Sequence, residues 1–197
     1  MILPIRAGQA ALAIHGFIAC SVLVRLLGLA IALRSARVEP STIRLYWLSG
    51  WAAQVLFALS AVLIARWIYH AHGTFNANRH DPSEISPAWA VGWFLVPVAN
   101  FIMPYAAMRQ LVNRSFGPGS VAAQAAPLRR WWLALLAGGI LEYLGNPLAE
   151  REPMLAGMTL LAVGTGLRII SAWLLLRIIG AVTDAQIQRC APIRPPA

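Results

Sequence analysis

Long apolar runs dominate the chain, and short polar stretches separate them. Four runs are long enough to cross a bilayer as helices, which takes about 20 mostly apolar residues. These runs cover approximately residues 10–33, 45–68, 131–149 and 154–180. Each is longer than a core helix of a soluble protein usually needs to be. The pattern predicts an all-α fold, a polytopic transmembrane helical bundle forming one domain over residues 1–184, with a flexible C-terminal tail over 185–197.

A fifth apolar segment, approximately residues 88–111, contains a helix-break motif formed by Pro97, Asn100 and Pro104. Proline removes an amide donor and clashes with the preceding turn, so two prolines break or kink this helix. In lipid, the freed carbonyls need partners from neighbouring helices or water. Two interpretations follow: a Pro-kinked fifth span, or a re-entrant hairpin. The absence of charge over residues 85–108 favours the fifth span.

The charges bear on topology and location. All sixteen basic residues are arginines, and most lie near the ends of the apolar runs. With either four or five spans, ten arginines fall on one side of the membrane and four on the other. Both topologies place the 109–130 loop and the C-terminus on the Arg-rich side, which the positive-inside rule assigns to the cytoplasm. Further aromatic and basic residues suit interfacial anchors: Trp89, Trp93, Tyr105, Arg109, Trp131 and Trp132.

Composition supports a membrane location. The chain is 59% hydrophobic and 12% charged, whereas soluble proteins average roughly 45–50% and about 25%. The formal net charge of +9 comes from scattered arginines and not from a basic run, so we expect no nucleic-acid partner. The expected partners are the lipid bilayer and either other membrane proteins or further copies of this chain. The arginine-rich, lysine-free usage suggests a GC-rich genome, and we expect the protein to lie in a bacterial inner membrane.

One central motif resembles a known family. Residues 86–101 read SPAWAVGWFLVPVANF, and Pro104-Tyr105 and Met108-Arg109 follow. This pattern is similar to the signature of DUF4328, a family of bacterial integral membrane proteins of unknown function. The order of apolar runs resembles that family over most of the chain. The resemblance implies a multi-pass membrane protein and brings no activity with it.

Three charges lie inside predicted spans: Arg25, Glu142 and Arg168. A charge at the bilayer centre costs at least roughly 2.5–3.5 kcal/mol on insertion scales, so these side chains should face the interior and pair. The sequence allows either an Arg25–Glu142 or an Arg168–Glu142 pair. With Asn100 these residues form a candidate intramembrane polar network. The functional interpretation is that Glu142 carries protons, or that the unpaired arginine binds an anion.

Signals for a cofactor, metal or catalysis are weak. His70 and His72 are two residues apart, which points them about 200° apart on a helix, so we expect no metal site. The sequence has no phosphate-binding glycine loop and no metalloprotease or serine-hydrolase motif, and we expect neither a cofactor nor an enzyme. The favoured hypothesis is a non-enzymatic accessory or scaffold protein. The alternative is a small transporter or channel that uses the 97–104 break and the intramembrane charges.

Overall fold

The structure, a computed structural model, describes residues 2–33, 40–76, 85–117, 121–149 and 154–190. All regular structure in these ranges is helical, which confirms the predicted all-α class. The elements in chain order are α1 (Ile2–Leu33), α2 (Pro40–Asn76), α3 (Pro87–Gly92), η1 (Ala99–Phe101), α4 (Met103–Phe116), α5 (Val121–Ala149) and α6 (Met154–Cys190).

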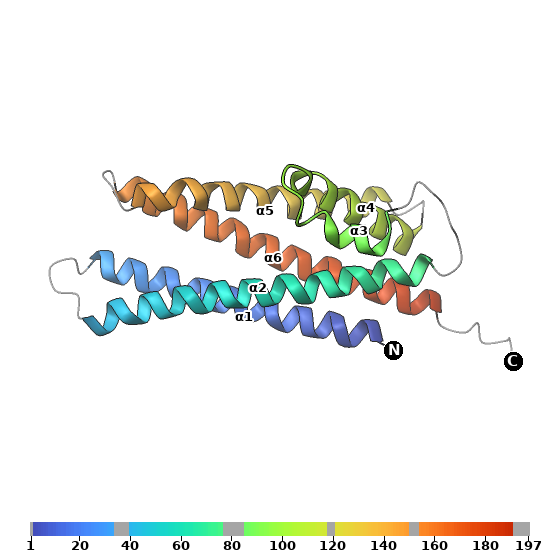
Figure 1. The fold of residues 1–197 in the computed structure, drawn as a ribbon, viewed down its shortest axis with the longest axis horizontal. Coiled ribbons are helices and arrows are strands. Elements are labelled where there is room, and N and C mark those ends of the chain that lie inside the picture. The colour runs from blue at the N-terminus through green and yellow to red at the C-terminus, as the bar shows by residue number, and fades with distance from the viewer. Residues whose placement is uncertain (1, 34–39, 77–84, 118–120, 150–153, 191–197) are drawn as a thin grey trace, which may run out of the picture.

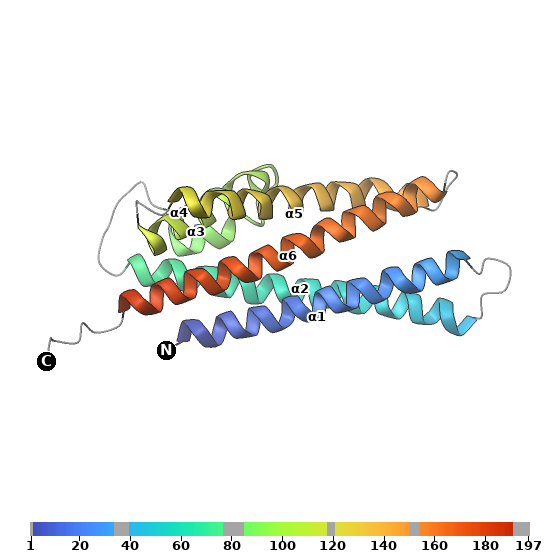
Figure 2. The ribbon, with the colours of Figure 1, turned by 180° about the vertical axis from the view of Figure 1, so that it is seen from behind.

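Four long helices form two antiparallel hairpins, α1–α2 and α5–α6 (Figure 1). The start of α1, the end of α2, the start of α5 and the end of α6 lie at one end of the molecule, together with α3 and α4. We call this the closed end and the opposite one the open end. Seen from either side, α6 lies beside α5 at the open end and nearer α1 and α2 at the closed end (Figure 2). The two hairpins therefore diverge toward the open end.

The hydrophobic core occupies the closed half of the bundle. Its fully buried side chains come from α2, α4, α5 and α6, and include Trp67, Met108, Leu111, Leu128 and Ile179. Helix α1 contributes small and branched residues near its start. Burial of apolar side chains is the main stabilising contribution in such a cluster. We therefore expect the closed end to be the part of the fold most stable against local unfolding.

The 88–111 segment is not a kinked fifth span. It consists of α3, a turn, η1 and α4, and both helices lie in the closed half, where α3 packs against α2 and α4 packs against α5 and α6 (Figure 1). Helix α3 starts where Ser86 Oγ accepts a hydrogen bond from the amide of Trp89 (3.3 Å). After the turn, α4 runs back toward the end from which α3 began. The segment is thus a helical hairpin and not a continuous helix, and we call it the re-entrant hairpin after the second of the two arrangements that the sequence allowed.

The turn of this hairpin contains a strained residue. The amide of Ala99 donates to the carbonyl of Pro97 (2.8 Å), closing a three-residue γ-turn around Val98. Val98 has φ 67° and ψ −54°, a conformation that a β-branched residue rarely adopts. Pro97 itself has no amide to continue a helix. The chain therefore reverses here, and the break that the sequence indicated becomes a turn.

Three helices are long and apolar enough to cross a membrane, over Ile5–Val24, Trp47–Thr74 and Ala156–Arg189. This is fewer than the four or five spans predicted from the sequence. Among the described residues, α5 does not reach the same apolar character, because Glu142, Asn146 and Pro147 interrupt its second half. It nevertheless lies alongside α6 over much of its length.

Two further details differ from the prediction. Helix α6 continues through Cys190, so residues 185–190 are helical and not part of a flexible tail, while 191–197 lie outside the described residues. Trp131 and Trp132, predicted as interfacial anchors, are only 3% and 7% exposed. The indole of Trp132 donates to the carbonyl of Phe101 (3.2 Å), so this residue fastens the re-entrant turn to α5.

Candidate functional site: a charged pair between the hairpins

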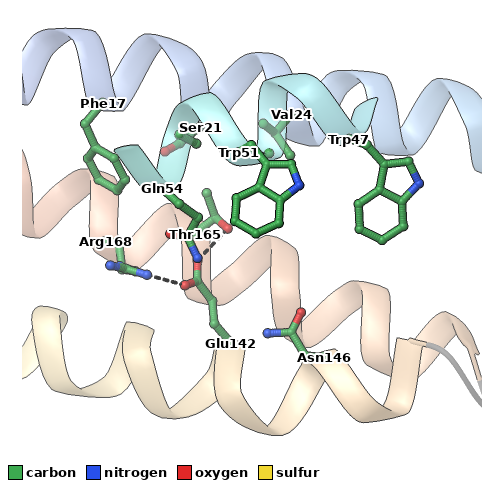
Figure 3. A pocket seen from close by; sticks show the side chains of 12 residues that line it. Phe17, Ser21, Val24, Trp47, Trp51, Gln54, Glu142, Asn146, Thr165 and Arg168 are labelled. Atoms are coloured by element: carbon green, nitrogen blue, oxygen red, sulfur yellow. Dashed lines mark hydrogen bonds and ion pairs between the residues drawn. The ribbon is translucent and has the colours of Figure 1, made fainter. Parts of the chain in front are cut away.

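Glu142 on α5 and Arg168 on α6 form an ion pair inside the bundle. Nη1 of Arg168 lies 2.6 Å from Oε2 of Glu142. The hydroxyl of Thr165, one helical turn before Arg168, donates to Oε1 of Glu142 (2.8 Å). Both carboxylate oxygens therefore have a partner, and Figure 3 shows the three side chains converging. Of the two pairings that the sequence allowed, the Arg168–Glu142 pair is confirmed.

Glycines bring the two helices close enough for this pair. A Cβ placed at Gly138 would lie 2.8 Å from the carbonyl oxygen of Gly164 and 2.8 Å from Cγ of Arg168. A Cβ at Gly164 would lie 2.9 Å from the carbonyl oxygen of Gly138. Small residues are the usual means by which membrane helices approach closely. We call Gly138, Gly145, Gly157 and Gly164 the glycine seam of α5 and α6.

The guanidinium of Arg168 also contacts the other hairpin. Its Cζ lies 4.5 Å from the ring centroid of Phe57 on α2 and 5.6 Å from that of Phe17 on α1. Both distances are within the range of a cation–π attraction, which strengthens where water is excluded. Arg168 therefore links all four long helices, through Glu142 on one side and the two phenyl rings on the other.

A cavity of about 350 Å³ opens beside the ion pair, on its open-end side. We call it the polar cavity after the polar side chains that reach it, although most of its wall is apolar. Gln54 and Ser21 face it from α2 and α1, and Asn146 faces it from α5 (Figure 3). The indoles of Trp47 and Trp51 form an aromatic part of its wall. Its size falls in the range of small-molecule sites, and its polar groups come from both hairpins.

A larger and mainly apolar cavity of about 730 Å³ lies on the other side of the pair. Its wall includes Phe57, Phe94, Trp132 and Leu135, which come from α2, α5 and the turn after α3. Arg168 and Phe17 line both cavities. The charged pair therefore stands at the boundary between a polar and an apolar compartment.

Of the predicted polar network, Glu142 and Arg168 are in contact. Arg25 lies in α1, but its side chain is outside the described residues, so its pairing stays a prediction. Asn100 lies in η1, is exposed, and lines the apolar cavity, whose wall Arg168 also reaches. Pro104 is buried in the first turn of α4, where the missing amide costs no helical hydrogen bond. Pro97 is exposed in the turn.

The remaining predicted anchors lie on the re-entrant hairpin. Trp89 and Arg109 are exposed, while Trp93 and Tyr105 are half-buried. The rings of Trp89 and Trp93 lie 4.7 Å apart. The interfacial placement of these four residues stays a prediction.

A polar junction at the closed end was not foreseen from the sequence. Nε2 of Gln186, at the end of α6, donates to the carbonyl of Ala71 (3.2 Å) and to Oγ of Ser115 (3.3 Å). The indole of Trp67 donates to Oγ1 of Thr183 (3.2 Å). These bonds connect α6 to both α2 and α4. Such pairings join residues far apart in the chain, so no local pattern marks them.

The glycine seam, in contrast, has a sequence signal. Gly138 and Gly145 are seven residues apart, and so are Gly157 and Gly164. Seven residues are close to two helical turns, so each pair lies on one face. This repeat of seven is the signal from which the seam could have been predicted.

Comparison with known proteins places the chain in a family. Residues 29–184 match the family described as Domain of unknown function (DUF4328). The chain belongs to the DUF4328 family. The matched range contains the re-entrant hairpin, the glycine seam and the ion pair of this DUF4328 protein, but not the start of α1. No curated protein and no solved structure matches the chain.

Proposed function

We propose that this DUF4328 protein is a multi-pass component of the bacterial inner membrane that acts without catalysis, as an accessory or scaffold for other membrane proteins or for further copies of itself. The observation that supports this is the bonding of the central charges. Glu142 is bonded through both oxygens, and Arg168 spans to the rings of the second hairpin. These charges are engaged in holding helices together. Nucleic acid is not among the proposed partners.

The proposed topology has α1, α2, α5 and α6 crossing the bilayer and the α3–α4 hairpin entering it from one side. Most described arginines outside the bundle centre lie in the closed half: Arg6, Arg66, Arg109, Arg114, Arg129, Arg130, Arg177 and Arg189. Arg44 lies at the open end. By the positive-inside rule, the closed end and the C-terminus face the cytoplasm.

Reporter fusions test this topology. Cytoplasmic and periplasmic reporters fused to the N-terminus and to the C-terminus should both report the cytoplasmic side. Reporters on opposite sides would require an odd number of spans and would contradict the four-helix crossing. A reporter placed after Leu33, at the end of α1, should report the periplasm and serves as the internal control.

A small transporter is the second candidate, and the polar cavity favours it. The cavity of about 350 Å³ is lined from both hairpins, and Glu142 is at its inner wall. Transporters bind substrates and ions between two helical units near the middle of the membrane. In this case Glu142 would exchange its partner Arg168 for a substrate or a proton.

Two variants of Glu142 distinguish the candidates. Glu142→Ala leaves Arg168 and Thr165 without their acceptor, which for an accessory protein costs about 1–3 kcal/mol of stability in detergent. This is below the value for a fully buried pair, because Glu142 and Arg168 keep 16% and 18% exposure. Asp184→Asn is the control, since it removes an exposed carboxylate of α6.

For a transporter, Glu142→Gln should fold as the wild type and abolish proton flux. The flux is measured in proteoliposomes under a pH gradient, with a pH-sensitive dye inside. Wild-type stability of Glu142→Gln together with loss of a measurable wild-type flux would refute the accessory function. Absence of flux from the wild type itself, with a destabilised Glu142→Ala, supports it.

A further inference from the structure

Two arginines and a histidine gather at the closed end of the α1–α2 hairpin. Arg6 lies in the first turns of α1, and Arg66 and His70 lie near the end of α2. Arg66 and His70 are four residues apart, so they occupy one face of their helix. Arg6 and Arg66 lie within electrostatic range of each other and of the His70 ring. Like charges brought together repel, so this arrangement needs a compensating group.

Arg6 shows where such a group is missing. Its Nη1 is closed off from solvent and has no hydrogen-bond partner. An inaccessible donor without an acceptor costs free energy, and more so when it is charged. Among the described residues, no carboxylate forms an ion pair with Arg6 or Arg66. The described part of the chain therefore presents donors for which it supplies no acceptor.

The packing keeps these groups in place. Ala10 and Ile14, on the same side of α1 as Arg6, are buried in the core against Trp67 and Ile68 of α2. The register between the two helices is therefore set by apolar contacts next to the charged side chains. The site is a property of the folded hairpin and not of two freely moving arginines.

The level of the cluster in the membrane indicates the acceptor. The apolar part of α1 begins at Ile5 and that of α2 ends at Thr74, so these side chains lie near one edge of the bilayer. Exposed Tyr69, which is adjacent, is of the type that sits among lipid headgroups. Phosphate oxygens accept bidentate hydrogen bonds from guanidinium groups, and anionic headgroups attract arginines near the surface.

We propose that Arg6, Arg66 and His70 form a binding site for the phosphate group of an anionic phospholipid in the leaflet at the closed end. The phosphate accepts from the accessible parts of the guanidinium groups of half-buried Arg6 and exposed Arg66, and it offsets the repulsion between the two arginines. The site lies outside the ion pair and both cavities described above. It therefore does not depend on the proposed accessory function.

Lipid binding to the purified full-length protein in detergent tests the site. Native mass spectrometry measures the apparent affinity for phosphatidylglycerol and for phosphatidylcholine in the wild type, Arg66→Gln and Arg6→Gln/Arg66→Gln. Arg44→Gln is the matched control, because Arg44 is an exposed arginine at the other end of α2. A parallel titration with inorganic phosphate separates a lipid headgroup from a free anion. Circular dichroism checks that each variant is folded.

The wild type should bind phosphatidylglycerol more tightly than phosphatidylcholine. Losing one arginine should weaken this binding roughly fivefold, and losing both roughly thirtyfold. Arg44→Gln should bind as the wild type does. Because Arg66 is exposed, Arg66→Gln keeps the test valid if the double variant does not fold.

Three results would overturn the proposal. The first is an unchanged affinity for phosphatidylglycerol in Arg66→Gln. The second is an equal loss in Arg44→Gln, which would mean that lipid binding follows total charge and not this site. The third is displacement of phosphatidylglycerol by inorganic phosphate, which would make the ligand a free anion.

Discussion

The glycine seam predicts that a single added methyl group destabilises the protein at Gly164, where the helices are in contact, but not at Gly166, where there is open space. Gly164→Ala places a Cβ 2.9 Å from the carbonyl oxygen of Gly138 and 2.9 Å from Cγ of Glu142. Ordinary contacts of this kind are several tenths of an ångström longer. The backbone of α5 cannot move aside without carrying Glu142 away from Arg168. The substitution should therefore loosen the helix pair and the ion pair together.

The magnitude follows from two opposing terms. Adding a methyl group to a well-packed contact costs about 1–3 kcal/mol. Replacing glycine by alanine in a helix gains about 0.8–1.0 kcal/mol. Gly166→Ala isolates the second term, because a Cβ at Gly166 meets nothing within 4 Å. The difference between the two variants then equals the packing cost alone, about 1–3 kcal/mol.

The assay is thermal unfolding of the purified protein in detergent, followed by circular dichroism. For a chain of this size, about 1 kcal/mol shifts Tm by about 2–4 °C. Gly164→Ala should therefore melt roughly 2–12 °C below Gly166→Ala. A Gly164→Ala protein that melts at or above Gly166→Ala would show that α5 and α6 are not in close contact here. Gly138→Ala with Gly164→Ala should cost less than the sum of the two, since one separation accommodates both.

The remaining predictions concern the closed end and the re-entrant turn. Gln186→Leu removes the amide that donates to Ala71 and Ser115, and it should lower the free energy of unfolding by about 1–3 kcal/mol, measured through Tm. Gln188→Leu replaces an exposed residue of the same helix and should leave Tm unchanged. An equal loss in both variants would contradict the polar junction. Val98→Gly should raise stability by about 1 kcal/mol, because glycine accepts φ 67° and the valine side chain is 77% exposed. Val98→Ala keeps a Cβ in the same strained conformation and should show no gain; a gain as large as that of glycine would refute the strain.

Local properties of the chain were predictable. The all-α class followed from run length and composition, because a long apolar run satisfies its backbone only as a helix in lipid. The helix break near Pro97 followed from the missing amide of proline. The cost of an isolated charge in an apolar run required Glu142 to have a basic partner, and the sequence limited that partner to Arg25 or Arg168. Each of these conclusions depends on residue type and near neighbours.

Tertiary structure decided everything that depends on distances between separate segments. The break became a reversal and not a kink because α3 packs against α2 while α4 packs against α5 and α6 at the same end. Trp131 and Trp132 are buried there, and Trp132 bonds to Phe101 of the turn. Arg168 forms the ion pair with Glu142 because the glycine seam brings α5 and α6 close together at that level. Periodicity specifies which face of a helix is apolar, but the neighbour that covers that face is chosen by the packing of the whole bundle.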